Sequence, residues 1–178
     1  VAVLSDDLRG TNLSVITQDS TQVLRSDLTG LISFSWSPDG NYVAYRTIVE
    51  NRLSALNILD AITGQVVATT RAEGAIAFFW SPNSQYIAYI TPGVAPGTFS
   101  ARPSGNNMMV GSAQQQNPGL AWSVVDVASG NTRRYGNFMP TTEMIYLLTF
   151  FDQFAQSHRV WSPDSRYVVF GEEIGRAS

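Results

Sequence analysis

A short block that occurs three times in this chain constrains its fold more than any other feature. The copies begin Trp-Ser-Pro at Trp36, Trp80 and Trp161. Each continues through Asp or Asn, then Gly or Ser, and reaches a Tyr that opens an apolar run. A block that recurs within one chain indicates a repeat architecture, in which every repeat is one supersecondary unit.

Each copy predicts two strands joined by a tight turn. Residues 31–36 predict the first strand, because apolar and serine side chains alternate from Ile32 to Trp36, which is the period of a strand with one buried face. Residues 42–48 form a β-branched and aromatic run that can be covered on both faces. The Ser-Pro-Asp-Gly between them suits a type I turn. Because the later copies carry Ser where the first has Gly40, we expect that a left-handed backbone is not required there.

The spacing of the copies predicts propeller blades. A third strand at 56–60 and a fourth at 65–69 follow the first block, and Trp36 and Trp80 are 44 residues apart (80 − 36). Four antiparallel strands within that length match one blade of a β-propeller. We therefore expect an all-β chain of two full and two partial four-stranded antiparallel blades. Their limits are residues 1–29 (partial), 30–73 (full), 74–156 (full) and 157–178 (partial).

The partial blades lie at the two ends of the sequence. Residues 13–17 and 22–25 align with the third and fourth strands of the first full blade, so residues 1–4 would belong to a second strand. Residues 161–170 would supply strands one and two of the last blade. A closed ring typically has four to eight blades. The sequence leaves open whether this is a segment of a larger ring or a ring completed by other chains.

The second full blade contains two insertions, since Trp80 and Trp161 are 81 residues apart (161 − 80). Residues 92–118 separate its second and third strands, and residues 137–156 follow its fourth strand. In an up-and-down blade these two links leave from the same end of the sheet. Both insertions are therefore predicted on one face of the protein, beside one blade.

The second insertion predicts a short helix and a contact surface. Helical spacing relates Met144, Leu147, Leu148, Phe151 and Phe154, with Thr141 or Thr142 as the cap and Glu143 at the positive helix end. Ile145, Tyr146 and Phe150 make the opposite side apolar too. That side is covered either by the first insertion, an irregular loop by composition, or by a partner, a neighbouring subunit or a membrane surface. The candidate contact residues are Met108, Met109, Phe138, Tyr146, Phe150, Phe151 and Phe154.

Composition argues against several kinds of chemistry. The net charge is −3 without a basic cluster, so we expect no nucleic-acid partner. The chain has no Lys and no Cys, which excludes Schiff-base and thiolate chemistry and cysteine metal sites. It has no Gly-x-Ser-x-Gly nucleophile elbow and no apolar run long enough to span a bilayer. We expect no cofactor, metal or catalytic residue.

A few polar residues deserve separate interpretations. His158, the single histidine, precedes an innermost strand and is either a channel ligand or proton carrier, or a strand-edge imidazole bonded to backbone. Asp39, Asn83 and Asp164 occupy equivalent turns in different blades, so we expect them to stabilise turns rather than to share a ligand. Glu172 and Glu173 would face opposite sides of a strand and form no acid/base pair.

The three Trp-Ser-Pro blocks resemble the WD-repeat-like blades of TolB-type β-propellers, which also occur in prolyl-oligopeptidase-family peptidases. The resemblance implies a periplasmic or secreted protein that binds protein partners. We therefore expect a non-catalytic binding or scaffolding module. Two alternatives stay open: the gating propeller of a serine peptidase whose catalytic domain lies outside this chain, and a subunit of a larger extracellular or membrane-associated assembly.

Overall fold

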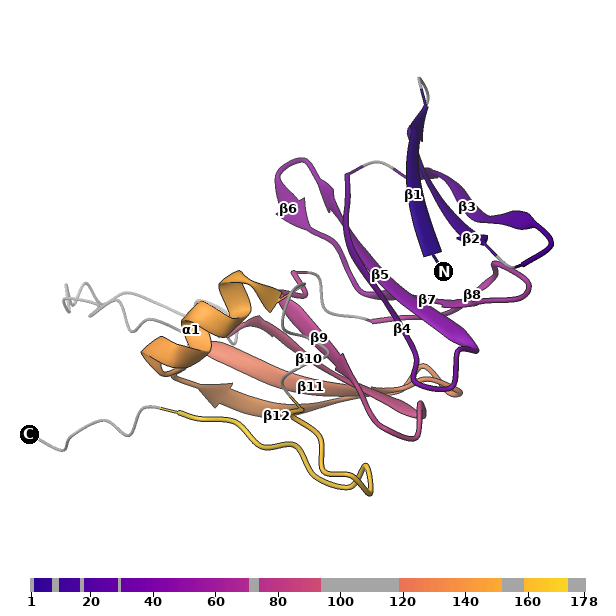
Figure 1. Ribbon diagram of the computed structural model, residues 1–178. Helices are drawn as coiled ribbons and strands as arrows, with labels where there is room; N and C mark the ends of the chain where they lie inside the picture. The colour runs from indigo at the N-terminus through magenta and orange to yellow at the C-terminus, as the bar shows by residue number, and fades with distance from the viewer. Residues whose placement is uncertain are drawn as a thin grey trace, which may run out of the picture.

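The chain folds into three antiparallel sheets followed by one helix and a hairpin (Figure 1). This computed structural model describes residues 2–7, 10–16, 18–28, 30–70, 74–93, 119–151 and 159–172. The four-stranded antiparallel sheets and the single short helix confirm the predicted all-β class. Met108, Met109, Phe154 and His158, together with Glu173, lie outside the described residues.

The first sheet contains β1 (Ala2–Asp7), β2 (Gly10–Ile16) and β3 (Thr21–Leu28), in that order. Leu4 pairs with Leu13 across β1 and β2, and Ile16 pairs with Thr21 across β2 and β3. These strands lie where the sequence predicted second, third and fourth strands.

The second sheet follows the predicted strand order. It runs β4 (Leu31–Trp36), β5 (Tyr42–Val49), β7 (Asn57–Asp60) and β8 (Val66–Thr69), while the short β6 (Arg52–Leu53) pairs with the end of β5. The apolar run at the start of β5 is covered on both faces, since Val43, Ala44 and Tyr45 are all buried. Together with Leu13, Leu24 and Leu59, Val43 and Tyr45 form a core between the first and second sheets.

The third sheet repeats this plan with β9 (Ala77–Trp80), β10 (Tyr86–Pro92), β11 (Leu120–Asp126) and β12 (Thr132–Phe138). Pro92 pairs with Leu120, and Leu120 pairs with Phe138. The first insertion therefore begins and ends at one end of this sheet, and the second begins at that same end, as predicted. The larger hydrophobic core surrounds this sheet, whose central strand β10 is buried from Ile87 to Ile90.

The predicted helix is α1 (Thr142–Thr149). Thr141 caps it, because its hydroxyl accepts a hydrogen bond from the Met144 amide at 3.3 Å, and Glu143 lies in the first turn. Met144, Leu147 and Leu148 pack against the larger core. In the described part of the chain, no helix combines the length and apolar character that crossing a membrane requires.

The turn after the first strand is left-handed in all three copies, which makes the sequence expectation wrong on this point. Gly40 has φ 74°, and the serines that replace it, Ser84 and Ser165, have φ 60° and 61°. A left-handed conformation strains a residue with a side chain. Each serine has a compensating bond: its hydroxyl accepts the amide N–H of the preceding block's turn, from Asp39 and Asn83 respectively, at 3.0 Å.

The expected strand pair at 161–170 is reduced to a hairpin with an isolated bridge. Trp161 bridges Val168, and the Val169 amide donates to the Val160 carbonyl at 2.9 Å. A second isolated bridge joins Pro140 to Glu172. In the other two copies a third strand pairs with the Tyr-containing strand. Within residues 159–172 and the other described ranges, no such strand lies beside Tyr167 to Phe170.

Candidate binding surface

Neighbouring blades are joined through the repeated block by three kinds of contact. Trp80 stacks on Tyr42 of the preceding sheet, with ring centroids 6.4 Å apart and planes 19° apart. Its indole N–H donates to the Ser35 carbonyl at 3.3 Å, and the Ser84 hydroxyl accepts the Asp39 amide. The block that fixes each hairpin therefore also fixes how one blade packs on the next.

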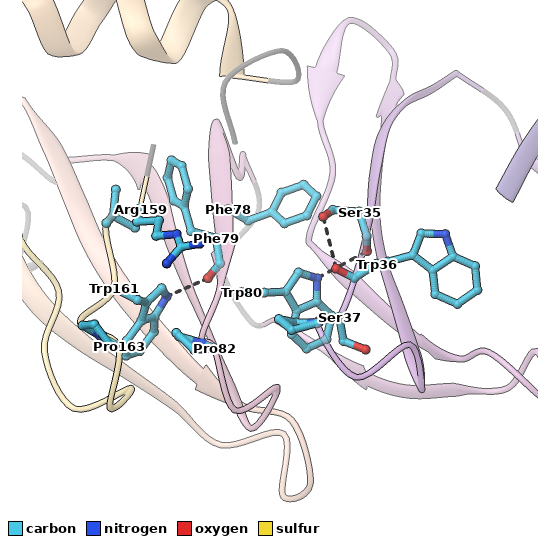
Figure 2. Close-up of a pocket in the computed structure, with 12 residues that line it drawn as sticks. Ser35, Trp36, Ser37, Phe78, Phe79, Trp80, Pro82, Arg159, Trp161 and Pro163 are labelled. Carbon is cyan, nitrogen blue, oxygen red and sulfur yellow. Dashed lines mark hydrogen bonds between the residues drawn. The ribbon is translucent and has the colours of Figure 1, made fainter. Parts of the chain in front are cut away.

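The next junction repeats this arrangement. Trp161 stacks on Tyr86 at 6.4 Å and 24°, and its indole donates to the Phe79 carbonyl at 2.9 Å. Figure 2 shows both indole hydrogen bonds as dashed lines. Trp36, the first copy, packs instead against the smaller core beside the first sheet. The sequence identified these tryptophans as strand residues but did not predict their indole bonds, because each acceptor lies in another repeat.

The turn carboxylates act within their own turns, as expected. Asp39 accepts a hydrogen bond from the Ser37 hydroxyl at 2.6 Å, and Asp164 accepts one from Ser162 at 2.6 Å. Burial raises the pKa of Asp39, but hydrogen bonds from Ser37, Asn41 and Ser84 outweigh it and leave that pKa below its usual value. The hydrogen bond from the Ser162 hydroxyl has the largest effect on Asp164 and lowers its pKa. Burial opposes it, and the Arg166 amide and charge lower the pKa further, so that it stays below its usual value.

An inner groove of about 560 Å³ lies along the first strands of the three blocks (Figure 2). Strand one is the innermost strand of a propeller blade and faces the central channel. The groove is lined mainly by aromatic and proline side chains, with Arg159 as its charged residue. Its principal members are Phe78, Phe79, Trp80, Pro82, Arg159 and Trp161.

A second concavity, which we call the helix-side hollow, lies between α1 and the C-terminal hairpin and measures about 640 Å³. Its walls are apolar on both sides: Met144, Tyr146, Leu147 and Phe150 from the helix segment, and Val160, Val169 and Phe170 from the hairpin. Glu143 and Arg159 add one charge of each sign. The hollow shares Phe79, Arg159 and Val160 with the inner groove, so the two concavities adjoin.

Four of the seven candidate contact residues are described, and they divide into two pairs. Tyr146 is 66% exposed and Phe150 is 47% exposed, and both line the helix-side hollow. Phe138 and Phe151 are buried in the larger core, which excludes them as surface contacts and corrects the sequence assignment. Phe138 packs 4.9 Å from Phe170, while Phe151 packs against Phe78 and Phe79 at 5.0 and 5.5 Å.

Phe151 also covers a buried arginine that the sequence gave no reason to select. Arg46, at 6% exposure, lies 5.1 Å from the centre of the Phe151 ring. Its guanidinium donates to the Ser33 hydroxyl at 2.6 Å, to the Ala75 carbonyl at 2.6 Å and to the Ile76 carbonyl. Arg46 therefore links the second sheet to the segment that begins the third. An arginine within a strand pattern normally indicates a solvent-facing position, so only the fold reveals this role.

The described residues contain no group of three His, Cys, Asp or Glu side chains that could hold a metal ion. Glu172 lies exposed at its bridge to Pro140.

Four-stranded antiparallel sheets, packed on one another through a tryptophan of the first strand and joined by Trp-Ser-Pro hairpins, are blades of a β-propeller. No protein-family model matches the chain, and no curated protein matches its sequence.

Two solved structures support the same fold, and a third is less similar. The tricorn protease superposes with a TM-score of 0.54 at 17% identity, over 78% of this chain and 12% of its own. An uncharacterized protein from Listeria monocytogenes EGD-e gives 0.52 at 10% identity, over 80% of this chain and 42% of its own. TolB from Acinetobacter baumannii gives 0.47 at 16% identity, over 79% and 31%. This chain spans less than half of each of these structures, and identities this low concern the fold alone.

Proposed function

We propose that this propeller module is non-catalytic and binds a protein partner through the helix-side hollow. The observation that carries the proposal is the position of Tyr146 and Phe150, which are exposed and stand over an apolar concavity. Exposed aromatic side chains next to a pocket are the residues that most often dominate the energy of protein interfaces.

The hollow has the dimensions and composition of a binding site. Its volume falls within the roughly 300–1,000 Å³ range of ligand pockets, which are mostly apolar with a few polar groups. Here those groups are Glu143 and Arg159, both exposed. Apolar surface removed from water contributes roughly 25 cal/mol per Å². A side chain inserted between α1 and the hairpin would therefore gain contacts from both walls, while the two charges orient it.

The non-catalytic part of the proposal rests on composition. The chain has a single histidine and neither lysine nor cysteine, which leaves few groups for acid/base or nucleophilic work. The likeness to the tricorn protease covers 12% of that chain, so it does not favour the peptidase-gating alternative. An extracytoplasmic location rests on the resemblance to TolB-type propellers alone, and fractionation of the producing cells tests it.

The test replaces Tyr146 and Phe150 with Ser together and compares the partners recovered by affinity purification from the producing cells. Ile62→Ser is the matched control. Ile62 is 74% exposed and lies in the turn after β7, at the end of its sheet opposite to the one that corresponds to the insertions. We expect the double variant to lose partners that the wild type and the Ile62→Ser control retain, with an unchanged melting temperature. Identical recovery by all three proteins, with intact folding, would refute the proposed surface.

A further inference from the structure

The blade junctions define a recurring site that we call the tryptophan socket. It consists of the Tyr that begins strand two, the carbonyl just before the strand-one Trp, and the amide of the turn Asp or Asn. In the first socket these are Tyr42, Ser35 and Asp39, and they receive Trp80 and Ser84. In the second they are Tyr86, Phe79 and Asn83, and they receive Trp161 and Ser165.

The C-terminal hairpin presents the same three groups a third time. Tyr167, the Val160 carbonyl and the Asp164 amide occupy the equivalent positions of the block. The Val160 carbonyl already accepts the Val169 amide at 2.9 Å, and a carbonyl oxygen has a second lone pair for an indole N–H. The hairpin has the turn geometry of the other copies, since the Ser165 amide donates to the Ser162 carbonyl at 2.9 Å as the Ser84 amide does to Ser81.

Exposure distinguishes this third socket from the other two. Tyr167 is 64% exposed, whereas Tyr42 and Tyr86 are partly buried under their tryptophans. The Arg166 guanidinium lies 5.8 Å from the centre of the Tyr167 ring. The adjoining strand is exposed as well: Val169 is 70% exposed, while its equivalents Ala44 and Ala88 are fully buried.

The two filled sockets show which chemistry fits the third. Both are filled by a Trp-Ser-Pro hairpin that carries Ser four residues after Trp, and in both the serine hydroxyl accepts the turn amide. The first block of a second copy of this chain lacks that hydroxyl, because it carries Gly40. Its Trp36 also packs against the smaller core. The second copy is therefore a poor occupant.

We infer that the socket formed by Tyr167, the Val160 carbonyl and the Asp164 amide docks a Trp-Ser-Pro-(Asp/Asn)-Ser hairpin from outside residues 1–178. The indole of that hairpin stacks on Tyr167 and donates to Val160, and its serine hydroxyl accepts the Asp164 amide. The socket shares Val160 with the helix-side hollow of the proposed function, but Tyr167 and Asp164 do not line that hollow, so Tyr167→Ser tests the socket separately.

The test uses a head-to-tail cyclised, fluorescently labelled peptide of this chain's own residues 77–90, which contains Trp80 and Ser84. Cyclisation matters because an isolated hairpin is marginally stable in water, and preorganisation lowers the cost of binding. Fluorescence anisotropy measures its affinity for the full chain and for Tyr167→Ser. Tyr135→Ser is the matched control, since Tyr135 is 60% exposed and lies 5.1 Å from the Arg133 guanidinium, outside any socket.

We expect the peptide to bind the wild-type chain, and to bind Tyr167→Ser about tenfold more weakly because one aromatic stack is lost. Its affinity for Tyr135→Ser should equal that for the wild type. A peptide with Gly in place of Ser84 should bind about fivefold more weakly, the equivalent of one hydrogen bond. No binding to the wild-type chain, or equal binding to both tyrosine variants, overturns the inference. A dimer of the chain alone that Tyr167→Ser dissociates would show that a second copy fills the socket without the serine, which also overturns it.

Discussion

The two ends of the four-stranded sheets differ sharply. At the turn end, where strands one and two are joined, the three copies make the same contacts: Ser37 bonds Asp39, Ser81 bonds Asn83 and Ser162 bonds Asp164, at 2.6, 2.7 and 2.6 Å. At the loop end, where strands two and three are linked, the second sheet has the short β6 and the third has an insertion, with α1 beside it. The contacts at the turn end are therefore the same in each copy, while the links at the loop end differ between the second and third sheets.

The turns between strands three and four extend this contrast. Asp60 accepts hydrogen bonds from the Ile62 and Thr63 amides, and Asp126 accepts them from the amide and hydroxyl of Ser129. These turns lie at the same end as the Trp-Ser-Pro turns, and each is tied to its neighbour by a backbone bond, such as Ala61 to the Asn41 carbonyl at 2.8 Å. Short polar turns therefore close this end of the second and third sheets, and the two insertions of the third sheet begin at the other end.

The largest effect should come from the loop end. Phe151→Ala removes a ring that is 2% exposed and packs against Phe78, Phe79 and Arg46. We expect the free energy of unfolding to fall by about 3–5 kcal/mol, as for other buried Phe→Ala changes. Phe150→Ala, at 47% exposure one position earlier, should cost less than about 0.5 kcal/mol. Urea denaturation of both variants checks this, and equal losses would mean that α1 and the segment after it are not anchored by Phe151.

Arg46→Met should have the next largest effect. The change keeps most of the side-chain volume but leaves the Ala75 and Ile76 carbonyls and the Ser33 hydroxyl without the guanidinium donor. We expect a loss of about 2–3 kcal/mol in urea denaturation, because each buried polar group without a partner costs about 1–3 kcal/mol. Arg46→Lys should recover only part of it, since an ammonium cannot reproduce the planar fork of donors. Full stability of Arg46→Met would show that this junction rests on apolar packing alone.

A smaller loss is expected at the turn end from Ser84→Ala. Alanine keeps the strained left-handed backbone at φ 60° but removes the hydroxyl that accepts the Asp39 amide. We expect the free energy of unfolding to fall by about 1–2 kcal/mol. Ser84→Gly also loses the hydroxyl but removes the strain, so it should cost less than Ser84→Ala. If the two variants lose the same stability, backbone strain plays no part at this position.

The same division explains what the sequence could predict. The strands of the three sheets, the positions of the turns and a threonine cap at 141 or 142 follow from local patterns and turn chemistry, and they were found where expected, whereas the strand pair at 161–170 was not. The burial of Phe151 depends on residues far away in the sequence, and Arg46 bonds to the segment that begins the next blade, so periodicity along one segment contains neither. The left-handed serines were missed for the same reason, since the amides that compensate Ser84 and Ser165 belong to the preceding repeat. Of the candidate contact surface, helical spacing placed Tyr146 and Phe150 on one side of the helix and Phe151 on the other, which is the buried side. Phe138 precedes the helix, and the local pattern did not indicate that it is buried.

The smallest effect is a pH dependence confined to the turn end. Hydrogen bonds hold the pKa of Asp39 and of Asp164 below the usual aspartate value. A carboxylate whose pKa is depressed by folding contributes stability above its unfolded pKa of about 3.9, and loses it as the pH falls through the folded value. The middle copy carries Asn83 at this position and has no such dependence there. We therefore expect Asp39→Asn with Asp164→Asn to flatten the decline in melting temperature below about pH 4.

At neutral pH the double variant should be slightly less stable than the wild type, because an amide accepts hydrogen bonds less strongly than a carboxylate. Both turns are largely exposed, so solvent screening keeps the effect small. Asp19→Asn, at an exposed position outside the blocks, serves as the control and should leave the acid decline unchanged. A double variant that melts like the wild type from pH 3 to pH 7 would contradict this prediction. It would show that these turns need only the side-chain oxygen that Asn83 also offers, and that the carboxylate charge adds nothing to their stability.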